Sequence, residues 1–378
     1  KEVSKGQPDE VIDPNDTSGQ GPHYQVNYNK KAPHGREDRY MMHVGLYEGE
    51  GNKKKNLQQY PDNTLTARIT KQFYLDVTNK VVFDVVAGQT YTPYIAYHGL
   101  WMSGYVFVDW NNDGVFDSTK GLTFDNNLPT RTDDCEVVSF SAHAKNDNGR
   151  WYNSNGKRFD KGGQFPQDDN VKNWLGSFKV PANLKEGIYR MRFKLDWNSL
   201  DPKGSDEILQ DGGDIIDVLV NVHKDVVKVG AKAENGTVSN GTVVLSEALN
   251  STSGYKQPVS VTFKAAEGYQ LVDATVRHGY NLLNESGLDE VGNRQWWAEK
   301  LEVSANSSTI PANLVNANVL VLPNFSAING IDGVKVSKEE LLENDVYNLN
   351  GQLVRRAGGK KALPLGVYVV KGKKFIVK

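Results

Sequence analysis

The sequence predicts an all-β protein, in which a jelly-roll or Ig-like β-sandwich is followed by two smaller β domains. Short apolar runs rich in Val, Ile, Tyr and Phe recur between residues 41 and 222, as in Phe73–Val77 and Tyr189–Leu195. Turn-forming clusters separate these runs, and no helical period persists across them, which is typical of sandwich strands. The length of 378 residues favours two or three domains.

Composition and charge exclude several classes of protein. The formal net charge is -2, so the chain lacks the basic excess of a general nucleic-acid binder, and we expect no nucleic-acid partner. No uninterrupted apolar run approaches the length that spans a membrane, so no transmembrane segment is expected. The single cysteine, Cys135, excludes an intrachain disulfide framework and a metal cluster built on thiolates.

The first segment, residues 1–39, is predicted to be extended and polar. Gly, Pro, Asn, Asp, Gln and Lys dominate it, which is typical of a tether between an anchor and a folded body. The chain begins at Lys1, and we expect an exported protein whose signal segment has been removed. The predicted location is therefore secreted, on the cell surface or facing the periplasm.

The main body, residues 40–224, contains the motif with the most specific chemistry. The predicted strand Tyr105–Val108 runs directly into acidic and amide residues at alternating positions, around the turn glycine Gly114. Ca²⁺ takes carboxylate, amide and carbonyl oxygens from positions 1, 3, 5, 7 and 9 of such a loop. The residues at these positions are Asp109, Asn111, Asp113, Val115 (through its main-chain carbonyl) and Asp117.

This pattern predicts a calcium site on a β scaffold. It is not an EF-hand, because Lys120 stands where an EF-hand has a bidentate Glu, and a strand rather than a helix precedes the loop. The alternative is a hairpin whose Asn-Asp-Gly corner only supplies the residues that such turns require.

A second Asp-Trp-Asn run, Asp196–Asn198, repeats the run Asp109–Asn111. If the two strands are neighbours, Asp196, or a loop carboxylate such as Asp201 or Asp206, could complete the six to eight oxygens that Ca²⁺ takes. A coincidental repeat is the alternative.

The segment Asp133–Trp174 is the predicted ligand-binding region. It is long and polar, and such segments in compact domains are usually functional. Trp151, Tyr152 and Trp174 are its candidate ligand-binding residues, because flat aromatic faces beside Asn and Asp are a common means of holding a sugar ring. The alternative is that these aromatic side chains fill the end of a sandwich. We favour that alternative for Trp296–Trp297.

Three runs in the main body resemble the GEVED domain of secreted bacterial proteins. The run Val108–Phe116 is close to that family's Asp-hydrophobic-Asn-x-Asp-Gly-x-Phe pattern, and Phe178–Arg192 contains its Pro followed by Gly-x-x-Arg-x-Arg. A third run stands where the family has Gly-Glu-Val-Glu-Asp-Tyr, and keeps only Gly213 and Asp217. The resemblance covers roughly residues 65–223 and implies a jelly-roll-like sandwich of extracellular, often multidomain proteins.

Two shorter units follow. Residues 225–327 resemble a small β-rich bacterial surface repeat, with a Gly-Thr-Val strand, a strand ending in Glu-Gly-Tyr and a closing Asn-Phe strand. This resemblance implies a spacer or adhesion module. Residues 328–378 resemble the C-terminal sorting domain of Bacteroidetes type IX secretion substrates, and their Asn-Gly and Lys-Gly-Lys corners indicate hairpins.

The sequence contains no Gly-x-Ser-x-Gly elbow, Walker loop, His-Glu-x-x-His motif or dinucleotide fingerprint. We therefore expect a non-catalytic binding protein with a calcium-stabilised sandwich, whose partner is a glycan or glycoprotein. One alternative is a surface adhesion or structural protein, which would bind another protein through a broad apolar patch. The other is a glycan-active hydrolase, which needs two carboxylates across one cleft.

Overall fold

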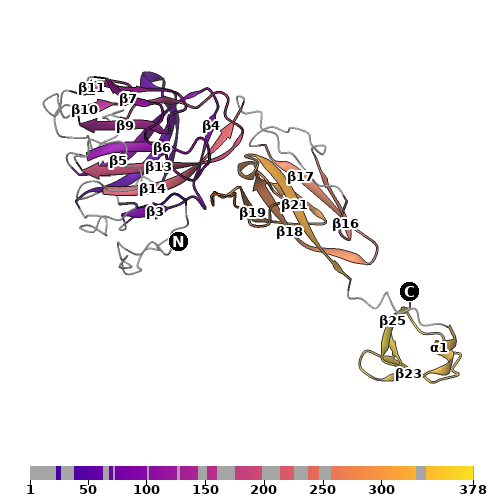
Figure 1. The fold of residues 1–378 in the computed structure, drawn as a ribbon. Helices are drawn as coiled ribbons and strands as arrows, with labels where there is room; N and C mark the ends of the chain where they lie inside the picture. The colour runs from indigo at the N-terminus through magenta and orange to yellow at the C-terminus, as the bar shows by residue number, and fades with distance from the viewer. Residues whose placement is uncertain are drawn as a thin grey trace.

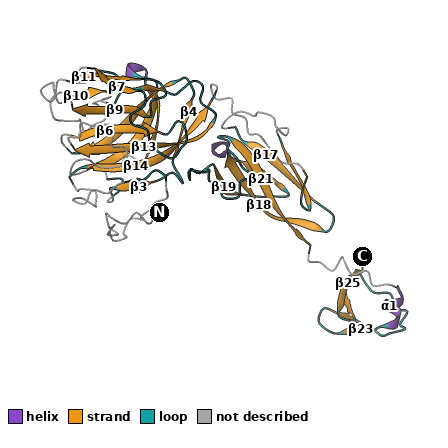
Figure 2. Ribbon diagram, in the orientation of Figure 1, coloured by secondary structure: helices purple, strands orange, loops and turns teal. Residues whose placement is uncertain are grey.

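The structure is a computed structural model, and nearly all of the regular structure in it is β-strand (Figures 1 and 2). The prediction of an all-β fold with several sheets is therefore confirmed. No helix of the described residues is long and apolar enough to cross a membrane. The described residues are 23–26, 38–62, 68–70, 73–99, 102–125, 128–143, 151–159, 175–197, 213–224, 237–246, 257–328 and 338–377.

The main body is a sandwich of two sheets. The smaller sheet has the order β12-β5-β1-β2, with β1 (Tyr40–Glu48), β2 (Lys55–Tyr60), β5 (Thr90–His98) and β12 (Phe178–Lys179). The larger sheet has the order β11-β10-β9-β6-β13-β14-β3, and β4 also pairs with β14. Its strands are β3 (Tyr74–Asp76), β4 (Val82–Val86), β6 (Met102–Val108), β9 (Val137–His143), β10 (Trp151–Asn153), β11 (Arg158–Phe159), β13 (Gly187–Trp197) and β14 (Gly213–His223).

One apolar core fills the space between the two sheets. Residues of alternating strand positions point inward, so Val44 and Leu46 of β1 share this core with Val106 of β6 and Phe193 of β13. The short elements at the edge of the sandwich are η1 (Gly51–Lys53) and a separate hairpin of β7 (Leu122–Asp125) and β8 (Leu128–Arg131).

The other face of the larger sheet is charged and still buried. Strand β13 places Arg190, Arg192, Lys194 and Asp196 on this face, and each is at most 6% exposed. The arginines lie beside Asp217 of β14, because the register pairs Arg192 with Asp217. Two runs that carry the GEVED resemblance are therefore neighbours in the sheet.

Residues 23–26 cover part of this charged face. The ring of Tyr24 lies 4.5 Å from the Arg190 guanidinium, and Val26 packs with Phe73 and Ile215. The main-chain N–H of Tyr24 also donates to the carbonyl of Gly114, at 2.7 Å. This part of the segment 1–39 is thus packed into the sandwich.

The second unit has its own core between two sheets. One sheet has the order β15-β16-β17-β20, and the other has the order β19-β18-β21. The elements are β15 (Thr237–Val238), β16 (Gly241–Leu245), β17 (Val259–Ala265), β18 (Tyr269–Gly279), β19 (Trp296–Leu301), β20 (Ser307–Ile310), η2 (Ala312–Leu314) and β21 (Asn318–Ala327).

The third unit also has a core of its own, which includes Val346, Tyr368, Val370 and Phe375. Its sheet has the order β23-β22-β24-β25. The elements are α1 (Lys338–Glu343), β22 (Val346–Asn348), β23 (Leu353–Arg355), β24 (Gly366–Val370) and β25 (Lys373–Val377).

Candidate functional site

The loop after β6 begins with a fully buried carboxylate. Asp109 is 0% exposed, and its Oδ2 accepts hydrogen bonds from the Tyr24 hydroxyl at 2.7 Å and from the Gly114 N–H at 2.9 Å. Its Oδ1 accepts from the Asp113 N–H at 3.2 Å. Burial raises the pKa of Asp109, although these hydrogen bonds oppose the shift. Asp109 therefore closes the loop and ties it to the segment 23–26.

The other predicted ligands lie on the outer part of the loop. Asn111 Oδ1 accepts from the Asp113 N–H, and Asp113 Oδ1 accepts from the Val115 N–H, at 2.9 and 3.1 Å. Asp117 Oδ1 accepts from the N–H groups of Thr119 and Lys120. These are Asx turns, in which a short polar side chain bonds the main chain two residues on.

Glu136 is a fourth carboxylate of this region, and no sequence pattern indicated it. Its Oε2 accepts from the Asp117 N–H at 2.6 Å, and its Oε1 accepts from the Trp110 N–H at 3.2 Å. Burial raises its pKa to about 7, and the negative charges of Asp109 and Asp113 add to the shift. The pairing of β6 with β9 brings Glu136 to the loop, so its position there could be predicted only from the order of the strands in the sheet.

The donor set of the loop fits Ca²⁺ by its chemistry, because carboxylate, amide and carbonyl oxygens make it up. These groups do not all point towards one common position where a metal ion could bind. Among the described residues, no three His, Cys, Asp or Glu side chains gather as a metal-binding group. The Asn111 amide also donates to Asp113 Oδ2 at 2.9 Å, so Ca²⁺ would have to replace this bond.

The second Asp-Trp-Asn run does not contribute to this site. Strands β6 and β13 are neighbours, as the repeat suggested, but they are antiparallel. The Asp109 N–H bonds the carbonyl of Arg190, whereas Asp196 pairs with Ser103 at the opposite end of β6. Six residues of strand separate Asp196 from the loop, or roughly 20 Å. Asp201 and Asp206 lie outside the described residues.

The predicted ligand-binding region contains strands where a loop was expected. Trp151 and Tyr152 are the first residues of β10, which pairs with β9 and β11. Tyr152 is half-buried, and Trp174 lies outside the described residues. The amide-rich turn after β10 explains the polar sequence, because Asn153 Oδ1 accepts from the N–H groups of Asn155 and Lys157, both at 3.0 Å.

A polar cavity of about 400 Å³ adjoins this turn. Side chains at its wall form a chain of hydrogen bonds, in which the Asn155 amide donates to Ser177 Oγ and Ser177 Oγ donates to Glu50 Oε2, each at 2.8 Å. We call this space the β10 cavity. Its lining residues are Glu50, Gly51, Asn52, Lys53, Thr92, Asn153, Asn155, Lys157, Leu175 and Ser177.

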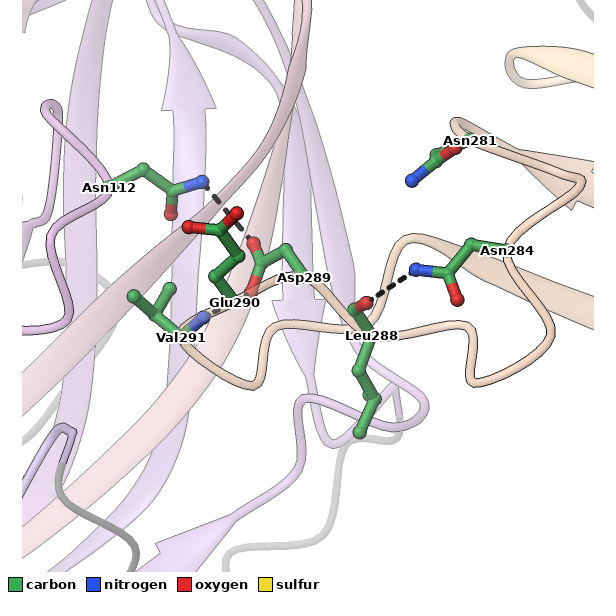
Figure 3. A pocket seen from close by; sticks show the side chains of 7 residues that line it. All are labelled: Asn112, Asn281, Asn284, Leu288, Asp289, Glu290 and Val291. Carbon is green, nitrogen blue, oxygen red and sulfur yellow. Dashed lines mark hydrogen bonds between the residues drawn. The ribbon is translucent and has the colours of Figure 1, made fainter.

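The segment Asn281–Gln295 of the second unit packs against the loop after β6. Figure 3 shows Asn112 and Asp289 facing each other across this joint, with Asn112 Nδ2 donating to Asp289 Oδ2 at 3.2 Å. Asn293 is 0% exposed, and its amide donates to the Tyr24 hydroxyl at 2.8 Å and to Asn112 Oδ1 at 3.0 Å. The loop after β6 is thus part of the joint between the two units.

Replacing Asn293 by alanine should loosen this joint. The change removes two hydrogen bonds of a fully buried side chain, which is expected to reduce the free energy of unfolding by about 1–3 kcal/mol. Glu290→Ala is the matched control, because Glu290 is an exposed residue of the same segment. Chemical unfolding of both variants checks the prediction, and equal losses for Asn293→Ala and Glu290→Ala would contradict it.

The comparisons with known proteins do not place the chain in a family. No family model matches the chain, and no curated protein matches it. The Bacillus anthracis TIE protein is a solved structure with 12% sequence identity, over 91% of this chain and 72% of that one, at a TM-score of 0.19. That score is too low for the likeness to support an argument, so the three family resemblances stay predictions.

Proposed function

We propose that the chain is a secreted or cell-surface, non-catalytic carbohydrate-binding protein with a calcium-stabilised β-sandwich. The β10 cavity carries the binding role in this proposal. Amide, hydroxyl, ammonium and carboxylate side chains line it, and these groups can donate to and accept from sugar hydroxyls. Glycoside hydrolysis uses two carboxylates, whereas the described lining of this cavity contributes one, Glu50.

The electrostatics of the loop after β6 support the calcium part of the proposal. Asp109 and Glu136 are buried carboxylates, and burial raises the pKa of each. The negative charge of Asp113 adds to both shifts, and that of Asp109 adds to the shift of Glu136. A cation on the loop would offset this repulsion and favour the ionised carboxylates. Main-chain N–H groups of the loop already donate hydrogen bonds to both carboxylates, so the loop is folded around Asp109 and Glu136.

Binding to a glycan array tests the carbohydrate role. The intact chain should be retained on at least one glycan, and Asn155→Ala with Lys157→Ala should weaken retention at least tenfold, since two polar groups are removed from the cavity wall. The melting temperature should stay nearly unchanged, because both residues are exposed. Trp151→Ala with Tyr152→Ala tests the predicted aromatic contact in the same assay.

Retention that survives both double variants would place the glycan elsewhere and contradict the assignment to the β10 cavity. Binding to no glycan, combined with capture of a purified surface protein, would favour the adhesion alternative. Turnover of a glycan would favour the hydrolase.

Calcium should raise the melting temperature, and a chelator should reverse the rise. A ligand that binds the folded state at 100 times its dissociation constant adds about 2.7 kcal/mol to the free energy of unfolding. Differential scanning calorimetry with and without Ca²⁺ measures this effect, and Mg²⁺ serves as the control cation. A melting temperature that is indifferent to Ca²⁺ would favour the turn-only alternative.

A further inference from the structure

A second cavity, of about 620 Å³, lies between the sandwich and the second unit. The turn before β4 and β4 itself form one wall, while β18, β19 and the η2 region form the other. We call this space the interdomain cavity. Its lining residues are Asn79, Lys80, Val82, Asp84, His278, Trp297, Glu299, Ala312, Asn313, Leu314 and Asn316.

Trp297 is the flat aromatic surface of this cavity. It was expected to be a core residue, but its side chain is only partly buried. The indole N–H donates to the carbonyl of Asn79 at 2.8 Å, so the residue bridges the two units. The ring is stacked with His278, at a centroid distance of 5.9 Å and an angle of 29° between the planes. The orientation of the indole is therefore fixed before any ligand arrives.

His278 is itself held in place. Its Nδ1 lies 3.1 Å from Asn316 Oδ1, and burial lowers its pKa. The imidazole is thus neutral at neutral pH, and it adds no positive charge to the cavity. Lys80 is the one cation of the described lining, against the carboxylates of Asp84 and Glu299. This balance disfavours phosphate groups and acidic sugars.

The hydrogen bonds beneath the cavity fix its two walls relative to each other. Asn221 of β14 donates to Asp84 Oδ1 at 2.9 Å and to the carbonyl of Asn316 at 3.2 Å. The Tyr280 hydroxyl donates in turn to Asn221 Oδ1 at 2.9 Å. A site whose walls are already ordered loses less conformational freedom when a ligand binds.

We propose that the interdomain cavity binds a single neutral sugar ring. The indole of Trp297 offers a flat face to the C–H groups of the ring, while Asp84, Glu299 and Asn313 offer oxygens and an amide to its hydroxyls. The volume lies within the roughly 300–1,000 Å³ of small-molecule sites, and such sites are common between domains. This site is separate from the β10 cavity, so it extends the proposed function.

Saturation-transfer NMR tests the proposal. The probe is an equimolar mixture of glucose, galactose, mannose and N-acetylglucosamine, at millimolar concentrations with the intact chain. We expect saturation transfer to the ring protons of at least one sugar, and a loss of at least tenfold in affinity for Trp297→Ala. Trp296→Ala is the matched control, because this neighbouring, partly buried indole lies under the Arg277 guanidinium and does not line the cavity. Its signals should equal those of the unchanged chain.

Two further variants separate ligand contact from a loosened joint. Trp297→Phe removes the bond to Asn79 but keeps an aromatic face, and it should retain measurable binding. Asn313→Trp places a large side chain at an exposed position of the lining, and it should abolish binding without lowering the melting temperature.

The outcomes also distinguish this site from the β10 cavity. Saturation transfer that persists in Trp297→Ala and disappears in Asn155→Ala with Lys157→Ala would overturn the interdomain proposal and leave the proposed function standing. The absence of saturation transfer to any of the four sugars would overturn the interdomain proposal as well. Saturation transfer that is lost in Trp297→Ala and retained in Asn155→Ala with Lys157→Ala would support the interdomain proposal. This holds even if the glycan array gives no signal for the β10 cavity.

Discussion

Asp217→Ala is expected to lower the free energy of unfolding by about 3–5 kcal/mol, because it leaves two buried guanidinium groups without their shared counter-charge. Asp217 is fully buried, and its Oδ1 and Oδ2 accept from Arg192 Nε at 2.7 Å and from Arg190 Nε at 2.9 Å. Burial alone would raise the pKa of Asp217, but Arg192 and Arg190 hold it below its usual value. The carboxylate is therefore ionised wherever the protein is folded at neutral pH.

Asp76→Ala is the matched control for this prediction. Asp76 also bonds Arg190, but its side chain is partly exposed, so water can take over much of the interaction that is lost with the carboxylate. Its removal should cost about 1 kcal/mol. Urea unfolding followed by circular dichroism compares the two variants. Similar losses would show that the ion pairs of Asp217 with Arg190 and Arg192 do not hold β13 and β14 together.

Asp214→Asn should stabilise the protein at alkaline pH. Asp214 is fully buried on β14, where its Oδ2 accepts from the Met41 N–H at 2.6 Å and its Oδ1 has no hydrogen-bond partner among the described residues. Burial raises its pKa to about 8, which the Met41 bond and the charge of Arg68 only partly oppose. Asparagine keeps an oxygen for Met41 and has no proton to lose.

The direction of the pH effect follows from linkage. An unfolded Asp titrates near pH 3.9, so between this pH and about 8 the unfolded chain ionises while folded Asp214 keeps its proton. The stability that the protonated group contributes is complete below pH 3.9 and is lost as the pH rises towards 8. The loss is about 1.4 kcal/mol per pH unit. Asp214→Asn should not show this loss. Its free energy of unfolding should therefore exceed that of the unchanged chain by several kcal/mol at pH 8.

Unfolding free energies of the unchanged chain and Asp214→Asn, measured from pH 4 to pH 9, test this prediction. Other groups titrate in both proteins alike, so the difference between the two curves isolates Asp214. A difference that stays constant with pH would contradict a raised pKa at this residue.

The strands could be predicted from alternation, but the partners of the charged positions on β13 could not. Arg190, Arg192 and Lys194 alternate with apolar residues, a pattern that ordinarily indicates one solvated face. The structure buries them because each has a carboxylate partner: Asp217 pairs with both arginines, Asp76 also pairs with Arg190, and Asp196 pairs with Lys194. Residues 23–26 also cover part of the sheet. Tyr24 is more than 160 positions from Arg192 in the chain, and no local pattern links them.

The same limit applies to the candidate sites. The residues of the loop after β6 are consecutive, so their turn could be predicted from one run of sequence. Glu136 reaches the loop through sheet pairing, and the interdomain cavity combines β4 with β18 and β19. Trp297 was expected to be a core residue because sequence alone does not reveal that its strand borders another domain.

The loop after β6 is central to this account, because it joins the sandwich, the segment 23–26 and the second unit. Isothermal titration of Ca²⁺ into chelator-treated protein tests it most directly. We predict a single binding transition for the intact chain that is lost in Asp113→Ala and retained in Asp134→Ala, an exposed carboxylate outside the loop. No binding heat from the intact chain at several temperatures would contradict the calcium assignment and leave the loop as a set of Asx turns.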